Sequence, residues 1–130
     1  MGLERQLTGH PAGLRTLILV CMGSTLIGST DIYLHTTFKT QDTFRLAAQV
    51  VTGVGFIGGG AILQTKATVK GLTTAATLWM TAAVGLALGV GFYAAGIITT
   101  VLALFTLSIL ALIEHHLPST RLKRDKEAGD

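Results

Sequence analysis

The sequence has few charged residues. Only 13% of its 130 residues are Asp, Glu, Lys or Arg, whereas a soluble domain carries about 25% because water must solvate its surface. Three long stretches, residues 16–30, 46–64 and 71–113, contain no charged residue. This shortage excludes an ordinary soluble domain and indicates a chain that lies partly in lipid.

Cysteine and groupings of catalytic side chains are also scarce. Cys21 is the single cysteine, so no internal disulfide can form, and its apolar surroundings favour a small buried side chain. We find no paired carboxylates, nucleophile triad or cysteine–histidine cluster, and therefore expect no enzyme activity, no cofactor and no metal site. The net charge of +3 comes without aromatic residues between the basic ones, which favours a membrane surface over nucleic acid.

The apolar stretches predict an all-α fold, a polytopic transmembrane helix bundle. A crossing takes about 20 residues, and the run 71–113 as one helix would reach about 65 Å, twice the thickness of the hydrocarbon core. We therefore divide this run at its glycines, and one long helix, giving three spans, is the alternative. The predicted spans are Leu14–Thr30, Phe44–Leu63, Leu72–Leu88 and Tyr93–Ile113.

The distribution of Lys and Arg predicts the orientation. With four spans, only Lys39 and Arg45 lie on one side, and the other eight basic residues lie on the opposite side. The side rich in Lys and Arg is normally cytoplasmic, so both termini should be cytoplasmic. Residues 1–113 would then form the transmembrane domain, and residues 114–130 a charged cytoplasmic tail. A cleaved signal sequence over the first apolar run is a minor alternative.

The stretch TGVGFIGGG, residues 52–60, contains the spacing G-x-G-x-x-G. A dinucleotide site would need an acidic residue about 20 positions later, and none occurs between Asp42 and Glu114. On a membrane helix, small residues on one face allow a second helix to approach closely, so we predict that spans two and three cross tightly. A local break in the helix facing a cavity is the alternative. The predicted packing residues are Ala48, Thr52, Gly55 and Gly59 on span two, and Gly71, Ala75, Ala82, Gly85 and Gly89 on span three.

Polar side chains form one stripe at the start of span two. Asp42, Arg45 and Gln49 are spaced by three and four residues, which places them on one helix face. Asp42 can cap the helix and pair with Arg45, and this structural role is the simpler interpretation. The alternative is a polar entrance to an ion path, because polar groups inside a membrane are costly to leave unpaired and therefore suggest a function.

Three segments closely resemble the signature blocks of the MgtC/SapB family of bacterial membrane proteins, in the family's order and over roughly residues 2–93. They read GLERQLTGHPAGLRTLILVCMGS, RLAAQVVTGVGFIGGGAIL and VKGLTTAATLWMTAAVGLALGVGFY. The resemblance implies a helical protein of the bacterial inner membrane, associated with growth at limiting magnesium and, in pathogens, with survival inside macrophages. By motif position, the functional polar residues it implies are Arg15, Asp42, Arg45, Gln49, Thr73 and Thr74.

The chain also departs from the family pattern. Family members carry a further membrane helix that ends in a G-L-E-R-E type motif, whereas this sequence begins inside that motif, and longer members have a soluble C-terminal domain. The resemblance therefore implies a short form, and three hypotheses follow. The first is a regulatory protein that contacts membrane partners or copies of itself within the lipid bilayer. The second is a small ion-conducting or transport protein, and the third is an inert truncated fragment.

Overall fold

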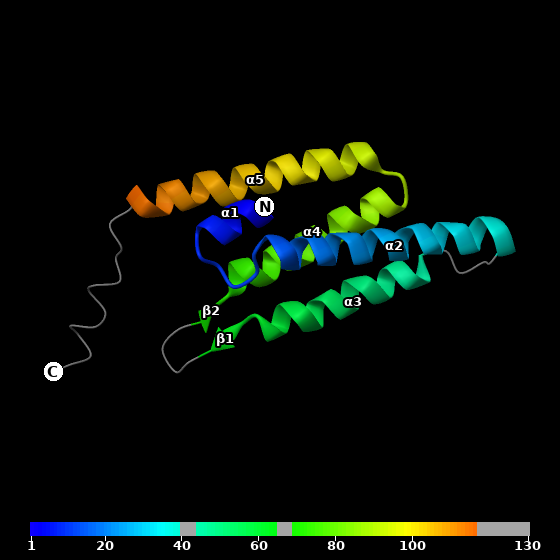
Figure 1. The fold of residues 1–130 in the computed structure, drawn as a ribbon, viewed down its shortest axis with the longest axis horizontal. Helices are drawn as coiled ribbons and strands as arrows, with labels where there is room; N and C mark the ends of the chain where they lie inside the picture. The colour runs from blue at the N-terminus through cyan, green and yellow to red at the C-terminus, as the bar shows by residue number, and fades with distance from the viewer. Residues whose placement is uncertain (40–43, 65–68, 117–130) are drawn as a thin grey trace.

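The computed structural model describes residues 1–39, 44–64 and 69–116. Most of the described residues are helical, as predicted, and Figure 1 shows the long helices lying roughly side by side. The described elements are α1 (Gly2–Leu7), α2 (Leu14–Phe38), α3 (Arg45–Gly60), β1 (Leu63–Gln64), β2 (Val69–Lys70), α4 (Leu72–Gly89) and α5 (Tyr93–His116).

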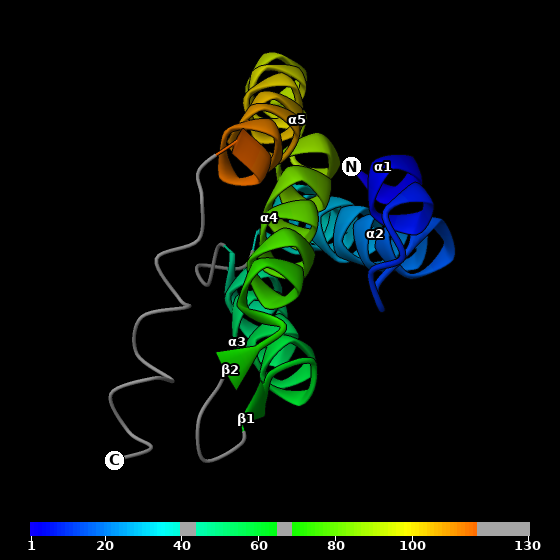
Figure 2. The same cartoon turned by 90° about the vertical axis from the view of Figure 1, so that its left-hand side faces the viewer.

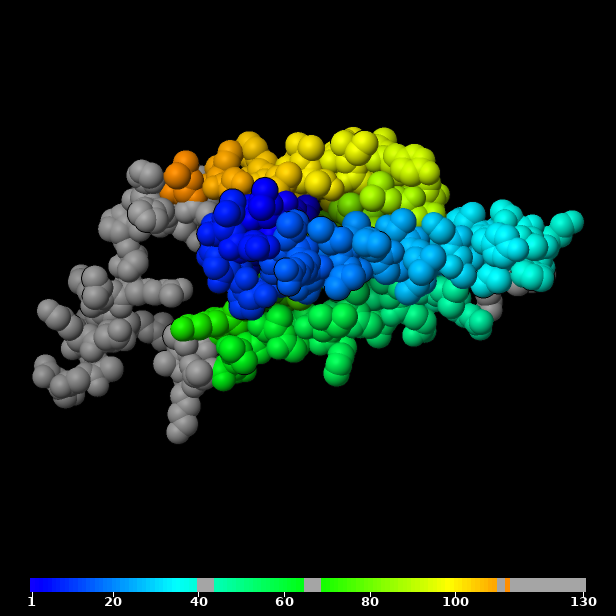
Figure 3. Space-filling model, viewed as in Figure 1, coloured from blue at the N-terminus to red at the C-terminus, as the bar shows by residue number. Residues whose placement is uncertain are grey.

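The long helices fall on the predicted segments. The chain turns between Gly89 and Tyr93, with Gly91 at a φ of 88°, so the long apolar run forms two helices rather than one. By length and composition, α2 and α4 could cross a membrane, and residues 93–109 of α5 form a shorter apolar helix. Helix α2 continues beyond the predicted span Leu14–Thr30 as far as Phe38, and Figure 3 shows its end extending beyond the neighbouring helices.

Helix α4 lies at the centre of the arrangement. It packs against α2, α3 and α5, and Figure 2 shows it between α5 and α3. Two small clusters of apolar residues form its contacts. Leu78 packs with Leu17 of α2, and Ala82 packs with Val50 and Val54 of α3. The centre of the bundle is therefore set by aliphatic side chains that project from α2 and α3 onto α4.

A short antiparallel ladder connects α3 to α4, where we predicted helix or loop only. Leu63 pairs with Lys70 in this ladder, which reverses the chain. Gly71 then adopts a φ of 91°, and a β carbon there would collide with the carbonyl oxygen of Ala61. Only glycine fits this turn, since it combines a left-handed conformation with a close backbone approach.

The closest backbone approach in the bundle is between α2 and α4. A β carbon on Gly85 would lie 2.5 Å from the carbonyl oxygen of Cys21, and one on Gly89 would collide with the carbonyl oxygen of Thr25. Hydroxyl groups bridge the same two helices. Thr25 Oγ1 donates to the Gly85 carbonyl at 3.0 Å, and Ser29 Oγ donates to the Gly89 carbonyl at 3.1 Å. Gly85 and Gly89 thus face α2 rather than the predicted α3, whereas Ala75 and Ala82 of α4 contact α3.

The predicted packing face of α3 points away from its neighbours. All four of its predicted residues are exposed, namely Ala48, Thr52, Gly55 and Gly59. Neither glycine would bring a β carbon within 4 Å of another part of the chain, so the prediction is wrong for them. The buried side of α3 carries Val50, Val54 and Gly58 instead, and Gly58 contacts Ala75. These valines set the rotation of α3, because a branched side chain makes more van der Waals contacts with α4 than a glycine does.

Candidate functional site

Two charged side chains are buried in the described part of the chain. Arg5 is 3% exposed and Asp31 is 5% exposed. Burying a charge is costly unless it is paired or hydrogen-bonded, so both positions call for an explanation. Arg5 lies on α1, beside the start of α2, and Asp31 lies towards the far end of α2.

Arg5 joins α1 to α4. Its Nη2 donates a hydrogen bond of 2.8 Å to Thr74 Oγ1, which connects residues 69 positions apart. The Arg5 Nε and the Glu4 Oε2 are buried without a hydrogen-bond partner among the described residues. Burial lowers the pKa of the Arg5 guanidinium, and the charge of Glu4 opposes this by raising it. The start of the chain thus brings a cation against the first turn of α4, and the charge of Glu4 acts on that cation.

Three threonines of α4 are buried, and they use their hydroxyls differently. Thr77 donates to the Thr73 carbonyl and Thr81 donates to the Thr77 carbonyl, both at 2.7 Å. These bonds satisfy the hydroxyl within one helix, which is common for threonine. Thr74 instead accepts from Arg5 across two helices. Of the predicted candidates Thr73 and Thr74, only Thr74 is buried, and it makes the long-range polar contact.

Asp31 joins α2 to α3. Its Oδ2 accepts a hydrogen bond of 3.0 Å from the backbone N–H of Ala47, in the first turn of α3. Phe44, the residue at the N-cap of α3, has a φ of 67° and provides no side-chain cap. A carboxylate at a helix N-terminus satisfies an N–H group and interacts favourably with the helix dipole. Asp31 therefore caps α3 from another helix.

The remaining predicted polar residues do not form one cluster. Arg15 is exposed in the first turn of α2, whereas Arg45 and Gln49 are exposed on α3. Asp42 lies outside the described residues, so the predicted stripe is visible only in part. The structure therefore does not bring Arg15 together with the stripe of α3.

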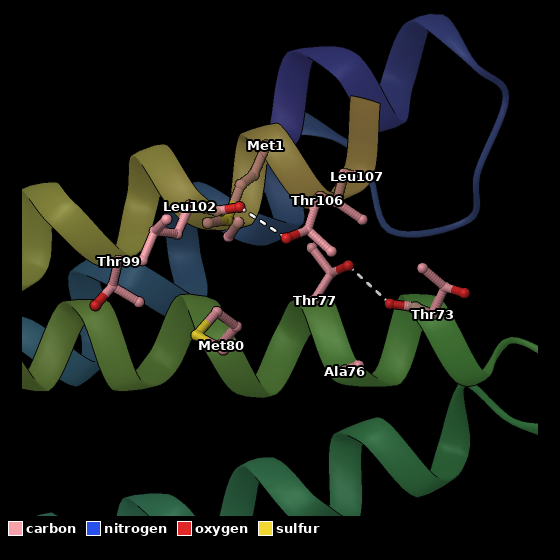
Figure 4. Close-up of a pocket in the computed structure, with 10 residues that line it drawn as sticks. Met1, Thr73, Ala76, Thr77, Met80, Thr99, Leu102, Thr106 and Leu107 are labelled. Atoms are coloured by element: carbon pink, nitrogen blue, oxygen red, sulfur yellow. Dashed lines mark hydrogen bonds between the residues drawn. The ribbon is translucent and has the colours of Figure 1, made fainter. Parts of the chain in front are cut away.

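Two apolar hollows flank the bundle. One, of about 360 Å³, lies between α4 and α5, and Figure 4 shows Met1 and Met80 at its wall. Its threonines include Thr77 and Thr106, which donate to carbonyls of their own helices, as the dashed lines in Figure 4 mark. The other is a groove of about 700 Å³ between α2 and α3, lined by mainly aliphatic residues together with Gln49. Neither hollow gathers groups that bind metal, since no cluster of three such residues occurs in the described part of the chain.

Sequence reasoning missed both buried charges as site residues. Arg5 enters the sequence-based prediction only as one of the eight basic residues that set the orientation, and Asp31 does not enter it. A signal for Asp31 was present, because it is the first acid after the charge-free stretch 16–30. Arg5 meets its acceptor on α4, and Asp31 meets its donor on α3. A local sequence pattern does not reveal a partner on another helix.

The described residues thus define a class of protein, an apolar helix bundle in which two helices meet through glycines and the buried charges join separate helices. Comparison with known proteins gives the family. The MgtC family model matches residues 1–116, and the chain belongs to this family.

Three curated relatives show the extent of the similarity. The YhiD protein of Escherichia coli K12, whose name proposes magnesium transport, is 47% identical over 115 residues, covering 84% of this chain and 53% of YhiD. SrpB of Synechococcus elongatus is 44% identical, covering 83% of this chain and 65% of SrpB. SapB of Bacillus subtilis is 35% identical, covering 95% and 56%. The chain therefore spans about half to two thirds of these relatives. No solved structure matches it significantly.

Proposed function

We propose that this chain is an integral protein of the bacterial inner membrane, with α2, α3, α4 and α5 as four spans and both termini in the cytoplasm. The four helices and their connections support this arrangement. The excess of Lys and Arg at the proposed cytoplasmic side supports the orientation. Residues 1–113 form the membrane domain in this proposal, and residues 114–130 are its cytoplasmic tail.

Its proposed role is regulatory or homeostatic and is linked to growth when magnesium is limiting. Membership of the MgtC family and the name of YhiD support the link to magnesium. In a pathogenic bacterium, the same role would support survival inside the macrophages of its host. The protein would work without enzyme activity, cofactor or nucleic acid, through contacts with membrane proteins or with copies of itself.

The observation that carries a contact-based role is the open face of α3. Its small residues Ala48, Gly55 and Gly59 are exposed, and a β carbon on either glycine would meet no other part of the chain. Lipid gives helices no hydrophobic reason to associate, so close approach through small residues is a main source of attraction between them. A helix of a partner or of a second copy could approach this face closely.

Growth at limiting magnesium tests this role. A strain that lacks the gene would carry the wild-type chain, Gly59→Leu or, as a matched control, Gly53→Leu, whose position on α3 also has open space around it. We expect rescue by the wild type and by Gly53→Leu, and no rescue by Gly59→Leu at equal protein level. Full rescue by Gly59→Leu would refute contact through this face.

Ion conduction is the second candidate, favoured by the name of YhiD and by the exposed Gln49 in the groove between α2 and α3. The mainly aliphatic lining of the groove makes it the weaker candidate, because an ion needs polar groups to replace its water. Magnesium uptake into vesicles containing the protein tests it, with Asp42→Asn as the variant. Uptake no faster than into empty vesicles, or uptake that Asp42→Asn leaves unchanged, would remove this candidate.

A further inference from the structure

The N-terminal end of α4 has hydrogen-bond donors without acceptors. The first bond within this helix runs from the Ala75 N–H to the Gly71 carbonyl at 2.9 Å. The backbone N–H groups of Leu72, Thr73 and Thr74 precede it, and none of them has a partner among the described residues. Gly71, at the N-cap, has no side chain that could cap them. Such a helix end carries a partial positive charge and attracts anions.

A buried cation stands at the same helix end. The Arg5 guanidinium is bonded through Nη2 to Thr74 Oγ1 in the first turn of α4, and its Nε has no partner in the part of the chain that the structure describes. Arg5 belongs to a different helix and is 3% exposed, so it is an independent feature that also favours an anion. A planar guanidinium together with uncapped N–H groups is the combination that binds phosphate groups in proteins.

The surroundings narrow the ligand further. Leu72 and Thr73 are exposed, so a ligand can reach the helix end from outside while Arg5 approaches it from the buried side. Glu4 Oε2 is also buried without a partner among the described residues, and its charge acts on Arg5, so it weakens the attraction of this end for an anion. A phosphate group offers several anionic oxygens, enough for Arg5 and for the N–H groups together.

We propose that the start of α4, beside Arg5, is a binding site for a phosphate group. The N–H groups of Leu72 and Thr73 and the guanidinium of Arg5 hold its oxygens, and the charge of Glu4 beside Arg5 limits the affinity. The group could belong to inorganic phosphate or to the headgroup of a lipid such as phosphatidic acid. The site is separate from the open face of α3 and does not depend on the proposed link to magnesium.

Two binding measurements on the full chain separate the two sources. In uncharged detergent, equilibrium dialysis measures the affinity for inorganic phosphate. In nanodiscs of phosphatidylcholine with added phosphatidic acid, native mass spectrometry counts the phosphatidic acid retained by the protein. Arg5→Gln should weaken binding about tenfold, since it removes a charge-assisted hydrogen bond. Lys39→Gln removes one positive charge at a distant exposed position and should leave binding unchanged.

The outcomes decide the proposal and its source. Phosphate binding in detergent that Arg5→Gln weakens assigns the site to inorganic phosphate, and an effect on retained phosphatidic acid alone assigns it to the lipid. No binding of either by the wild type, or equal effects of Arg5→Gln and Lys39→Gln, overturns the proposal.

Glu4→Gln gives a further test, because the expected result is a higher affinity and a variant that fails to fold would lose affinity instead. Removing the acid should raise the affinity several-fold, because the amide no longer repels the anion. Circular dichroism and the emission of Trp79, the single tryptophan, confirm that each variant is folded. If Arg5→Gln does not fold, an affinity raised by Glu4→Gln supports the site, and an unchanged or lower affinity overturns it.

Discussion

Helix α2 meets its two long neighbours in different ways. Against α4, the backbones approach so closely that Gly85 and Gly89 leave no room for a side chain, and two hydroxyls bridge the helices. Against α3, a groove of about 700 Å³ separates much of the two surfaces, and the bond from Ala47 to Asp31 joins them at one end. The difference teaches that glycine spacing identifies a surface that can pack closely, but not the helix it packs against.

The largest expected effect comes from filling the close interface. In Gly85→Leu the first side-chain carbon alone would lie 2.5 Å from the Cys21 carbonyl oxygen and 2.8 Å from Ser24 Cβ. Because backbone must move to admit the side chain, we expect a loss of about 3 kcal/mol or more in the free energy of unfolding. Thermal unfolding in detergent measures it. Gly23→Leu, on an open part of α2, is the control, and equal stability of both variants would contradict the packing described.

A smaller effect is expected at the capping contact between α2 and α3. Asp31→Ala removes the acceptor of the Ala47 N–H and should lower the free energy of unfolding by about 1–2 kcal/mol, as for other helix caps. Hydrogen exchange should show faster exchange in the first turn of α3, with α4 unchanged. Thr30→Val serves as the control, because the Thr30 hydroxyl bonds only within its own helix. Unchanged exchange in α3 would mean that Asp31 does not hold this helix.

The bridging hydroxyls should contribute less. Ser29→Ala removes the bond to the Gly89 carbonyl, and hydrogen bonds between membrane helices contribute about 0.6 kcal/mol on average. We expect a loss of that size in thermal unfolding. Thr36→Val, which loses only bonds to its own helix, should have a smaller effect. The reverse order would show that glycine contact alone joins α2 and α4.

The smallest effect on folding is expected on the open face of α3. Gly59→Leu meets no atom within 4 Å at its β carbon, so the free energy of unfolding should change by no more than about 0.5 kcal/mol. Gly58→Leu, one residue earlier and packed on Ala75, should be clearly less stable in the same detergent assay. A large loss in the free energy of unfolding for Gly59→Leu would mean that this face of α3 packs against another helix, contrary to the open surface described.

The positions of the helices could be predicted from the sequence, because charge-free stretches and the glycines at 89 and 91 mark where helices run and stop. The rotation of α3 could not, since the four small residues from Ala48 to Gly59 fit a contact equally well on any neighbour. Val50 and Val54 determine the rotation of α3, and their burial depends on the surface of α4 against which they pack.

The candidate site was predictable only in part. Thr74 was found through the family resemblance, but its partner Arg5 lies 69 positions away, beyond any local pattern. Asp31 likewise acts on a helix that begins after a connection, at Ala47. Charged residues that join separate helices give no periodic pattern in the sequence, because their partners come close only in the folded structure and not at a fixed spacing.

The different lengths of α2 and α3 have a consequence for the lipid around the protein. In the proposed topology, α2 with its 25 residues rises about 37 Å, and α3 with its 16 residues rises about 24 Å. Only α3 is shorter than a hydrocarbon core of about 30 Å, so the bilayer must become thinner beside it, at a cost for each ångström of mismatch. That cost acts on the groove between α2 and α3, while the contact between Asp31 and Ala47 joins the two helices. Bilayer thickness is therefore a physical variable that should widen or close this groove, and membranes of different lipid chain length would favour different spacings of the two helices.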